Sequence, residues 1–128
     1  MSYEIINPES LGAPSGWNHG MLGPRGGRVL FVAGQTAPAA GPGFVEQWAA
    51  VLERVVRVVR AAGGNPTDIG RMTIYVIDLA AYQTNLKPIG EAYRRLMGKH
   101  FPAMALVEVR GLVDPEAVVE IEATAVIA

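Results

Sequence analysis

The chain has 128 residues, of which 50% are hydrophobic and 18% charged, and its formal net charge is -1. This composition suits one domain over residues 1–128, and the interspersed charges lack the basic surface that nucleic acid or anionic lipid requires. Cysteine is absent, which excludes disulfides and a cysteine nucleophile. Residues 1–8 lack the pattern of a secretion signal, and no apolar stretch reaches membrane-spanning length, so we expect a cytoplasmic protein.

Hydrophobic periodicity predicts four strands and two helices in the order strand, helix, strand, helix, strand, strand. Their ranges are 29–33, 44–59, 72–77, 89–97, 103–109 and 118–126. Gly63 and Gly64 end the first helix, and Pro88 sets the start of the second. This order predicts an α+β domain in which two amphipathic helices cover one face of a sheet.

Alternate residues of a strand point to opposite sheet faces, so each face can be considered separately. One set is wholly apolar and predicts the core face: Ala105, Val107, Val109, Ile121, Ala123, Ala125 and Ile127. The other set mixes apolar and charged residues: Met104, Leu106, Glu108, Arg110, Glu120, Glu122, Thr124 and Val126, with Arg71, Thr73 and Tyr75. Such a face suits an interface between subunits, with ligand pockets in the clefts between them. The alternative is a monomer whose charged positions lie in water at strand ends.

Five segments, in order along the chain, resemble motifs of one protein family. They are Val32–Gln35, Ala61–Gly64 with Asp68, Thr73–Leu79, Phe101–Ala103 and Val119–Ala123. Together they are similar to the RidA (YjgF/YER057c/UK114) family. The resemblance implies a chorismate-mutase-like fold with a mixed sheet, and a homotrimer with a central barrel and small-molecule sites between subunits. It also implies hydrolysis of reactive enamines and imines with release of ammonia, without a metal or organic cofactor.

The family's activity relies on an arginine after the Phe-Pro-Ala motif, which binds the substrate carboxylate through a bidentate fork. Here that position is Met104. Loss of such a charged contact weakens carboxylate binding by about 1.5 to 3 kcal/mol, so the usual small imino acid is not the expected substrate. Met104 either fills a gap in a core or interface, or makes a pocket suited to an aromatic or uncharged group. A carboxylate could still reach Arg110, Arg25 or Arg28.

Glu120 matches the glutamate that positions the hydrolytic water in the family, which makes it the first catalytic candidate. A carboxylate in a cleft can orient water toward a C=N carbon and transfer protons to the leaving amine. The alternative is that Glu120 only pairs with Arg71 or Arg110 across the sheet. Gly34 and Gln35, in the Val-Ala-Gly-Gln segment, are candidate substrate contacts, as is Arg110.

The segment Gly16–Gly20 places an aromatic ring, an amide and an imidazole in one glycine-flanked loop. His19 is a second catalytic candidate because imidazole titrates near neutral pH, while Trp17 and Asn18 would contact the substrate. The alternative is that His19 is structural or simply exposed. No histidine lies at metal-ligand spacing from the scattered aspartates, so no metal site is expected.

Two functions therefore remain open. The first is an enamine or imine deaminase with Glu120 orienting the water. The second is a noncatalytic trimer that binds a small metabolite or a partner enzyme through the same clefts. Met104 favours the second function and Glu120 the first.

Overall fold

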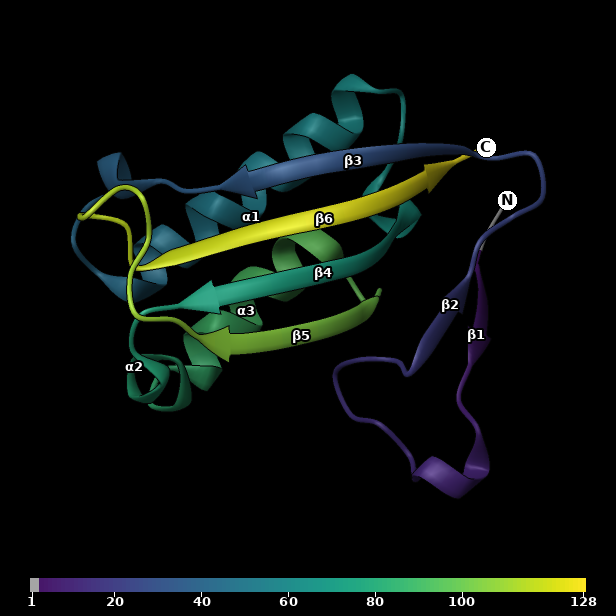
Figure 1. The fold of residues 1–128 in the computed structure, drawn as a ribbon, viewed down its shortest axis with the longest axis horizontal. Helices are drawn as coiled ribbons and strands as arrows, with labels where there is room; N and C mark the ends of the chain where they lie inside the picture. The colour runs from purple at the N-terminus through teal and green to yellow at the C-terminus, as the bar shows by residue number, and fades with distance from the viewer. Residues whose placement is uncertain (1–2) are drawn as a thin grey trace.

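The computed structural model describes residues 3–128 and contains one main sheet with helices on one side of it (Figure 1). The strands are β1 (Glu4–Ile6), β2 (Gly20–Leu22), β3 (Arg28–Gln35), β4 (Ile69–Val76), β5 (Ala103–Glu108) and β6 (Val119–Ile127). The helices are α1 (Phe44–Ala61), α2 (Leu79–Gln83) and α3 (Leu86–Met97), with short 3-10 turns at Glu9–Leu11, Pro38–Ala40 and Pro66–Asp68. Residues 1–2 of the N-terminal segment lie outside the described residues.

The main sheet has the strand order β3-β6-β4-β5, in which β4 and β5 are parallel and the other pairs antiparallel. This mixed sheet confirms the α+β class. The periodicity does not predict the separate β1–β2 ribbon or the short helix α2, whose first turn is capped by the Asp78 carboxylate. Helix α3 begins at Leu86, three residues before the predicted start, because Pro88 fits within a first helical turn.

The core lies between the sheet and helices α1 and α3. Helix α1 buries Val51, Leu52 and Val55 completely, and the apolar positions of β4 and β6 face them across the core. Fully burying one such aliphatic side chain contributes about 1.5 to 3 kcal/mol, so this apolar contact is the main force holding helix to sheet. Within residues 3–128, no helix combines the length and apolar character that crossing a bilayer requires.

Gln47 is the buried polar residue of α1, and its amide holds the two loops at one end of the sheet. Its Nε2 donates to the carbonyl oxygens of Gly41, at 2.9 Å, and Glu116, at 3.0 Å, while its Oε1 accepts from the backbone N–H of Val118 at 2.9 Å. All three bonds reach backbone groups outside α1. Gln47 therefore fixes the start of β6, the strand that carries Glu120.

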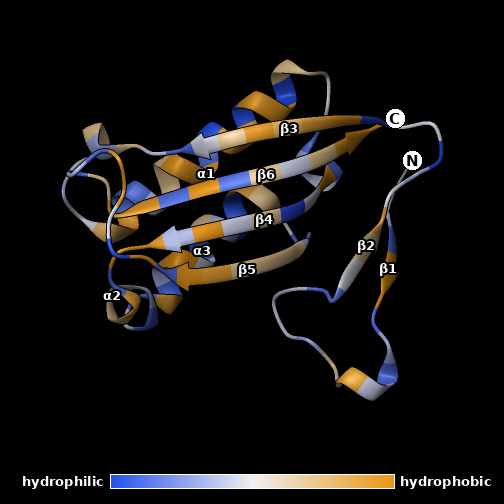
Figure 2. Ribbon diagram, in the orientation of Figure 1, coloured by the Kyte–Doolittle hydropathy of each residue, from blue (hydrophilic) through white to orange (hydrophobic). Residues whose placement is uncertain are grey.

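The predicted faces are correct for β4 and β6 but wrong for β5. Along β6, Ile121, Ala123, Ala125 and Ile127 are buried, and the intervening residues turn away from the helices. The hydropathy along the β6 ribbon alternates with the same period in Figure 2. In β5, however, Met104 pairs with Met72 and Leu106 with Ile74, whose side chains are buried on the helix side. Residues paired in a ladder share a face, so Met104 and Leu106 face the helices. Ala105 and Val107 take the opposite face.

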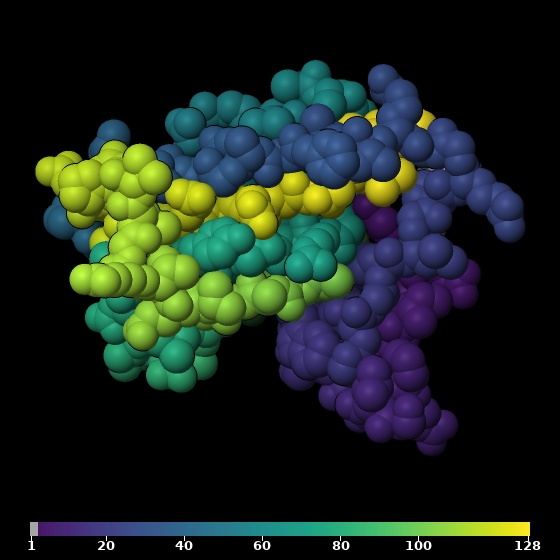
Figure 3. All heavy atoms as spheres, in the orientation of Figure 1, coloured from purple at the N-terminus to yellow at the C-terminus, as the bar shows by residue number. Residues whose placement is uncertain are grey.

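The open face of the sheet carries large apolar side chains at the surface. Phe31 is 79% exposed, Val29 55% and Val107 42%. No other segment covers the middle of this face in the space-filling view (Figure 3). Phe31 and Val29 are neighbours on the open face of β3, whereas Val107 lies on the other edge strand, β5, with polar residues of β6 and β4 in between. Exposed apolar side chains that cluster, as Val29 and Phe31 do, more often mark interaction surfaces.

Candidate functional site

The loop at 16–20 is bound to the start of β5, the edge strand of the sheet. Asn18 makes the connection, because its Nδ2 donates to the carbonyl oxygen of Phe101 at 2.6 Å and its backbone N–H donates to that of Pro102 at 3.3 Å. Asn7 supports Asn18 from the other side, its Nδ2 donating to Asn18 Oδ1 at 2.8 Å. The loop is thus held against the residues that precede Met104.

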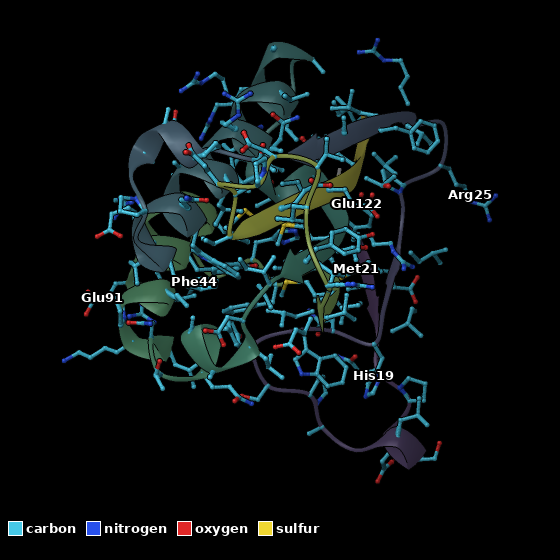
Figure 4. The ribbon with its side chains drawn as sticks, turned by 60° about the vertical axis from the view of Figure 1, so that its left-hand side comes forward. His19, Met21, Arg25, Phe44, Glu91 and Glu122 are labelled. Atoms are coloured by element: carbon cyan, nitrogen blue, oxygen red, sulfur yellow. The ribbon has the colours of Figure 1, made fainter. Side chains whose placement is uncertain are left out.

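Trp17 and His19 lie together in this loop. Their rings are 4.6 Å apart in an edge-to-face arrangement with an interplanar angle of 80°. The backbone N–H of His19 donates to Asn7 Oδ1 at 2.8 Å, and its Nε2 lies 3.3 Å from the carbonyl oxygen of Gly12. If Nε2 carries the proton, it donates this bond, so the ring has a structural partner at Gly12, just before the loop. Figure 4 shows His19 in the N-terminal segment beside the sheet.

A small hollow of about 180 Å³ brings three of the predicted site residues together with Met104. Its walls are Trp17, Asn18, His19, Arg71, Ala103, Met104 and Ala105. Arg71 supplies a positive charge at this hollow. The proximity of the loop to Met104 follows from the Asn18 hydrogen bonds to the two residues before Ala103.

A larger cavity of about 440 Å³ lies on the helix side of Met104. It is bounded by the sheet, the three helices and the loop, and its lining residues are Gly16, Trp17, Trp48, Leu52, Met72, Ile74, Tyr82, Leu86, Ile89, Gly90, Tyr93, Arg94, Phe101, Met104, Leu106 and Ile121. This volume falls within the range of small-molecule sites, which are mostly apolar with few polar groups. Met104 and Trp17 line both hollows, so the two spaces meet there.

Aromatic side chains make up much of the cavity wall. Trp48 packs on Tyr82 with ring centroids 5.7 Å apart, and Tyr93 stacks on Phe101 at 5.4 Å. The hydroxyl of Tyr93 donates to the carbonyl oxygen of His100 at 2.6 Å, and burial raises the pKa of this phenol above its ordinary value. Tyr93 is therefore a neutral, fixed wall residue over the physiological pH range.

Glu120 lies on the open face of the sheet, against the backbone of Gly34. A methyl group on Gly34 would lie 2.3 Å from Glu120 Oε2 and 2.8 Å from its Cδ, so the glycine provides the space for this carboxylate. Among residues 3–128, Glu120 forms no hydrogen bond or ion pair with a side chain. The proposed pairing with Arg71 or Arg110 is therefore absent within the described part of the subunit.

Its neighbour on the same face, Glu122, is engaged instead. The hydroxyl of Tyr75 donates to Glu122 Oε2 at 3.0 Å. This hydrogen bond to a carboxylate raises the pKa of Tyr75 above its ordinary value, with burial adding to the effect. The two glutamates of β6 thus differ, since Glu122 has a hydrogen-bond partner in the subunit and Glu120 has none among the described residues.

Gln35 and Arg110 lie apart from the loop site. Gln35 Oε1 accepts from Arg54 Nε of α1 at 3.2 Å, so its amide points toward that helix, next to the Gly34 and Glu120 pair. Arg110 is exposed beyond the end of β5 and lines neither hollow.

One subunit does not bring Glu120 and Met104 together. Glu120 pairs with Tyr75, which pairs with Val107, three residues after Met104 on β5. Strand spacing then places the two residues about 10 Å apart along the strands and about 10 Å across them. They also face opposite sides of the sheet. A small substrate cannot contact both within a single subunit.

The sequence reasoning missed the residues of the larger cavity on the helices, Trp48, Tyr82, Tyr93 and Arg94. The three aromatic residues occur at apolar positions, where hydrophobic periodicity predicts core packing and gives no sign of a cavity. Arg94 offers one weak signal, because Gly90 lies four residues earlier on the same helix face and leaves space beside it.

Comparisons with known proteins agree with this fold. The family model described as Endoribonuclease L-PSP matches residues 9–127. TdcF of Escherichia coli, named as a candidate reactive intermediate deaminase, is 34% identical over 108 residues, which cover 78% of this chain and 80% of TdcF. The structure of YyfB of Yersinia pestis, a Rid family protein of unknown function, matches with a TM-score of 0.84 and 33% identity, over 99% of this chain and 100% of YyfB. The structure of TdcF with bound serine matches with a TM-score of 0.63 and 28% identity, over 91% of this chain and 92% of the TdcF chain. The chain therefore belongs to the RidA/YjgF family.

Proposed function

We propose that the protein is a RidA-type hydrolase that converts a reactive imine or enamine into a carbonyl compound and ammonia. Water adds to the C=N carbon, a proton moves to the nitrogen, and the C–N bond then breaks to release ammonia; an enamine first tautomerises to the imine. Glu120 orients the water and transfers the protons. The observation that carries this proposal is the Glu120 carboxylate, which has no hydrogen-bond or ion-pair partner among residues 3–128 and is accommodated by Gly34.

The site belongs to an assembly in this proposal, since Glu120 and the loop with Met104 are too far apart within one subunit. The protein forms a homotrimer through the open sheet faces, and Glu120 of one subunit meets the loop at 16–20 of its neighbour. The exposure of Phe31 and Val29 on that face supports this arrangement, because burying both against a second subunit removes apolar area from water.

The substrate is not the usual small imino acid. Met104 stands where the family resemblance implies an arginine, and it lines an apolar cavity. The structure of the relative TdcF contains bound serine, a small amino acid. A large apolar cavity next to Met104 favours a larger and less polar side chain on the substrate.

A coupled assay tests the activity. An amino-acid oxidase generates imines from amino acids with small, aliphatic and aromatic side chains, and the rate of their hydrolysis is followed with and without the protein. Glu120→Gln should lower the rate enhancement by about 100-fold, since positioned acid–base groups contribute about that much. Glu122→Gln is the matched control on the same strand and face, and should retain activity within about threefold. Absence of any acceleration by the native protein would favour the noncatalytic binding function instead.

Mixing the Glu120→Gln and Trp17→Ala variants, if each lowers the rate by itself, tests whether the site is shared between subunits. Glu120→Gln and Trp17→Ala are refolded together, so that mixed oligomers form. If Glu120 acts with the loop of the neighbouring subunit, some sites in the mixture contain both native residues and activity returns. If activity does not return above that of the separate variants, the shared site is wrong.

A further inference from the structure

Within the described part of the chain, residues 3–128, the cavity on the helix side of Met104 has a single charged residue in its wall. That residue is Arg94 of α3, whereas every other side chain in the wall is apolar or aromatic. Among residues 3–128 no carboxylate lines the cavity, so the arginine supplies the formal charge of its wall. An apolar chamber with one cation at its edge is complementary to a molecule with an apolar body and one negative group.

Arg94 is free to bind such a group. Its side chain is exposed, and among residues 3–128 it forms no hydrogen bond or ion pair with a side chain. Glu91, one turn earlier on α3, is outside ion-pair distance and lies on the outer surface of the helix in Figure 4. The neighbouring Arg95 is also exposed but does not line the cavity.

Gly90 explains why Arg94 reaches the cavity. The two residues are four positions apart on α3 and therefore share a helix face. A methyl group on Gly90 would lie 3.4 Å from Arg94 Nη1, which places the guanidinium beside the glycine. Because Gly90 itself lines the cavity, the guanidinium lies at the cavity mouth.

We propose that Arg94 binds the carboxylate of a substrate whose large apolar or aromatic side chain fills the cavity next to Met104. The inference rests on the proposed function in one respect, that this cavity is the substrate site. The substrate is then the imine of an amino acid with a large apolar side chain. A guanidinium binds a carboxylate in a bidentate geometry, so Arg94 takes the carboxylate-binding role that Met104 cannot perform.

The cavity volume supports a large side chain. About 150 Å³ is enough to hold benzene in an apolar cavity, and this cavity measures about 440 Å³. A ring with a short linker therefore fits, with its carboxylate at the mouth. The side chain of serine or threonine would leave most of the space unfilled and would bring a hydroxyl group among apolar side chains.

Binding of stable probes tests the inference without turnover. Calorimetric titration compares 3-phenylpropanoate with its neutral isostere 3-phenylpropanamide. Arg94→Gln should weaken binding of the acid roughly tenfold, as expected for a charged hydrogen bond at an exposed mouth, and leave the amide within about twofold. Arg95→Gln is the matched control and should change neither affinity. Equal affinity of native protein and Arg94→Gln for the acid would overturn the proposal.

Gly90→Leu tests the location of the site. Leucine has a higher helix propensity than glycine, and its side chain would occupy the cavity, so the variant should fold and lose binding of both probes. Unchanged binding of both probes to Gly90→Leu would also overturn the proposal. The binding result and the imine assay can fail separately. Arg94-dependent binding without imine hydrolysis would reject the hydrolase function and retain the proposed ligand class. Imine hydrolysis that is insensitive to Arg94→Gln would retain the hydrolase function and reject Arg94 as the carboxylate-binding residue.

Discussion

Replacing Gly34 with alanine should separate catalysis from stability. Gly34 has no positive φ, so alanine can adopt its backbone conformation without strain. The new methyl group, however, would lie 2.3 Å from Glu120 Oε2, 2.8 Å from Cδ and 3.1 Å from Cγ. These atoms belong to the flexible end of a partly exposed side chain, which can rotate away. The carboxylate must therefore move while the sheet stays in place.

Gly34→Ala should change the free energy of unfolding only slightly and the rate of imine hydrolysis strongly. Forcing Glu120 off its rotamer costs about 0.5 to 1.5 kcal/mol. Replacing glycine lowers the entropy of the unfolded chain and returns about 0.4 to 1 kcal/mol. The free energy of unfolding should therefore change by less than about 1 kcal/mol. Displacing a catalytic group by about 1 Å can lower the rate by about 100-fold, and that is the expected loss of imine hydrolysis.

Urea unfolding and the coupled imine assay measure the two effects, with Gly111→Ala as the control. No atom lies within 4 Å of a methyl group at Gly111, which also lacks a positive φ, so this variant should retain both properties. Adding Gly34→Ala to Glu120→Gln should lower the rate by less than about threefold further, because the carboxylate is already lost. A full rate in Gly34→Ala, or a second 100-fold loss in the double variant, would refute the role of Gly34 in placing Glu120.

Two further predictions concern stability. Gln47→Leu should lower the free energy of unfolding by about 3 kcal/mol and Tm by about 10 °C, because it leaves three backbone groups without their hydrogen-bond partner. Scanning calorimetry measures both quantities. A loss below about 1 kcal/mol would contradict the role of the Gln47 amide. Burial raises the pKa of Tyr93, so the fold favours the neutral phenol while the unfolded chain ionises near pH 10. This stabilising effect is complete below pH 10 and is lost as the pH rises above it, by about 1.4 kcal/mol per pH unit. Between pH 9 and 11 the native protein should therefore lose about 1.4 kcal/mol more of its free energy of unfolding than Tyr93→Phe, as urea unfolding measures, and equal losses would exclude the effect.

The fold could be predicted from sequence where one strand face was clearly polar. In β6 glutamate and threonine alternate with isoleucine and alanine, so hydropathy alone assigns the buried face. In β5 both alternate sets are apolar over most of the strand, with Met104 and Leu106 on one side and Ala105 and Val107 on the other. Hydropathy cannot choose between two such sets, and only the pairing with β4 decides.

The candidate site could be predicted only in part for a similar reason. The loop at 16–20 and Met104 do lie together. The sequence signal for the loop was a cluster of side chains with hydrogen-bonding and stacking groups, and the signal for Met104 was its place after a family motif. Glu120 was also identified, but its distance from that loop depends on strand register, which a single sequence does not show. The cavity itself is formed by apolar side chains such as Trp48 and Leu52, whose pattern is the same whether the space between them is filled or open.

The corrected orientation of Met104 changes what its side chain implies for the substrate. On the helix side of the sheet, Met104 is part of the apolar cavity wall and not of the open face. A guanidinium at this position would have to be desolvated among apolar and aromatic side chains, at a cost of several kcal/mol unless an anion paired with it. Methionine avoids that cost and leaves the chamber neutral. With the positive charge at Arg94, at the exposed mouth, water can still solvate the guanidinium when no ligand is bound. The apolar chamber and the cationic mouth are therefore separate, and this arrangement favours long ligands. Only a molecule whose apolar body is long enough to fill the chamber can bury that body there and also bind Arg94 through its negative group.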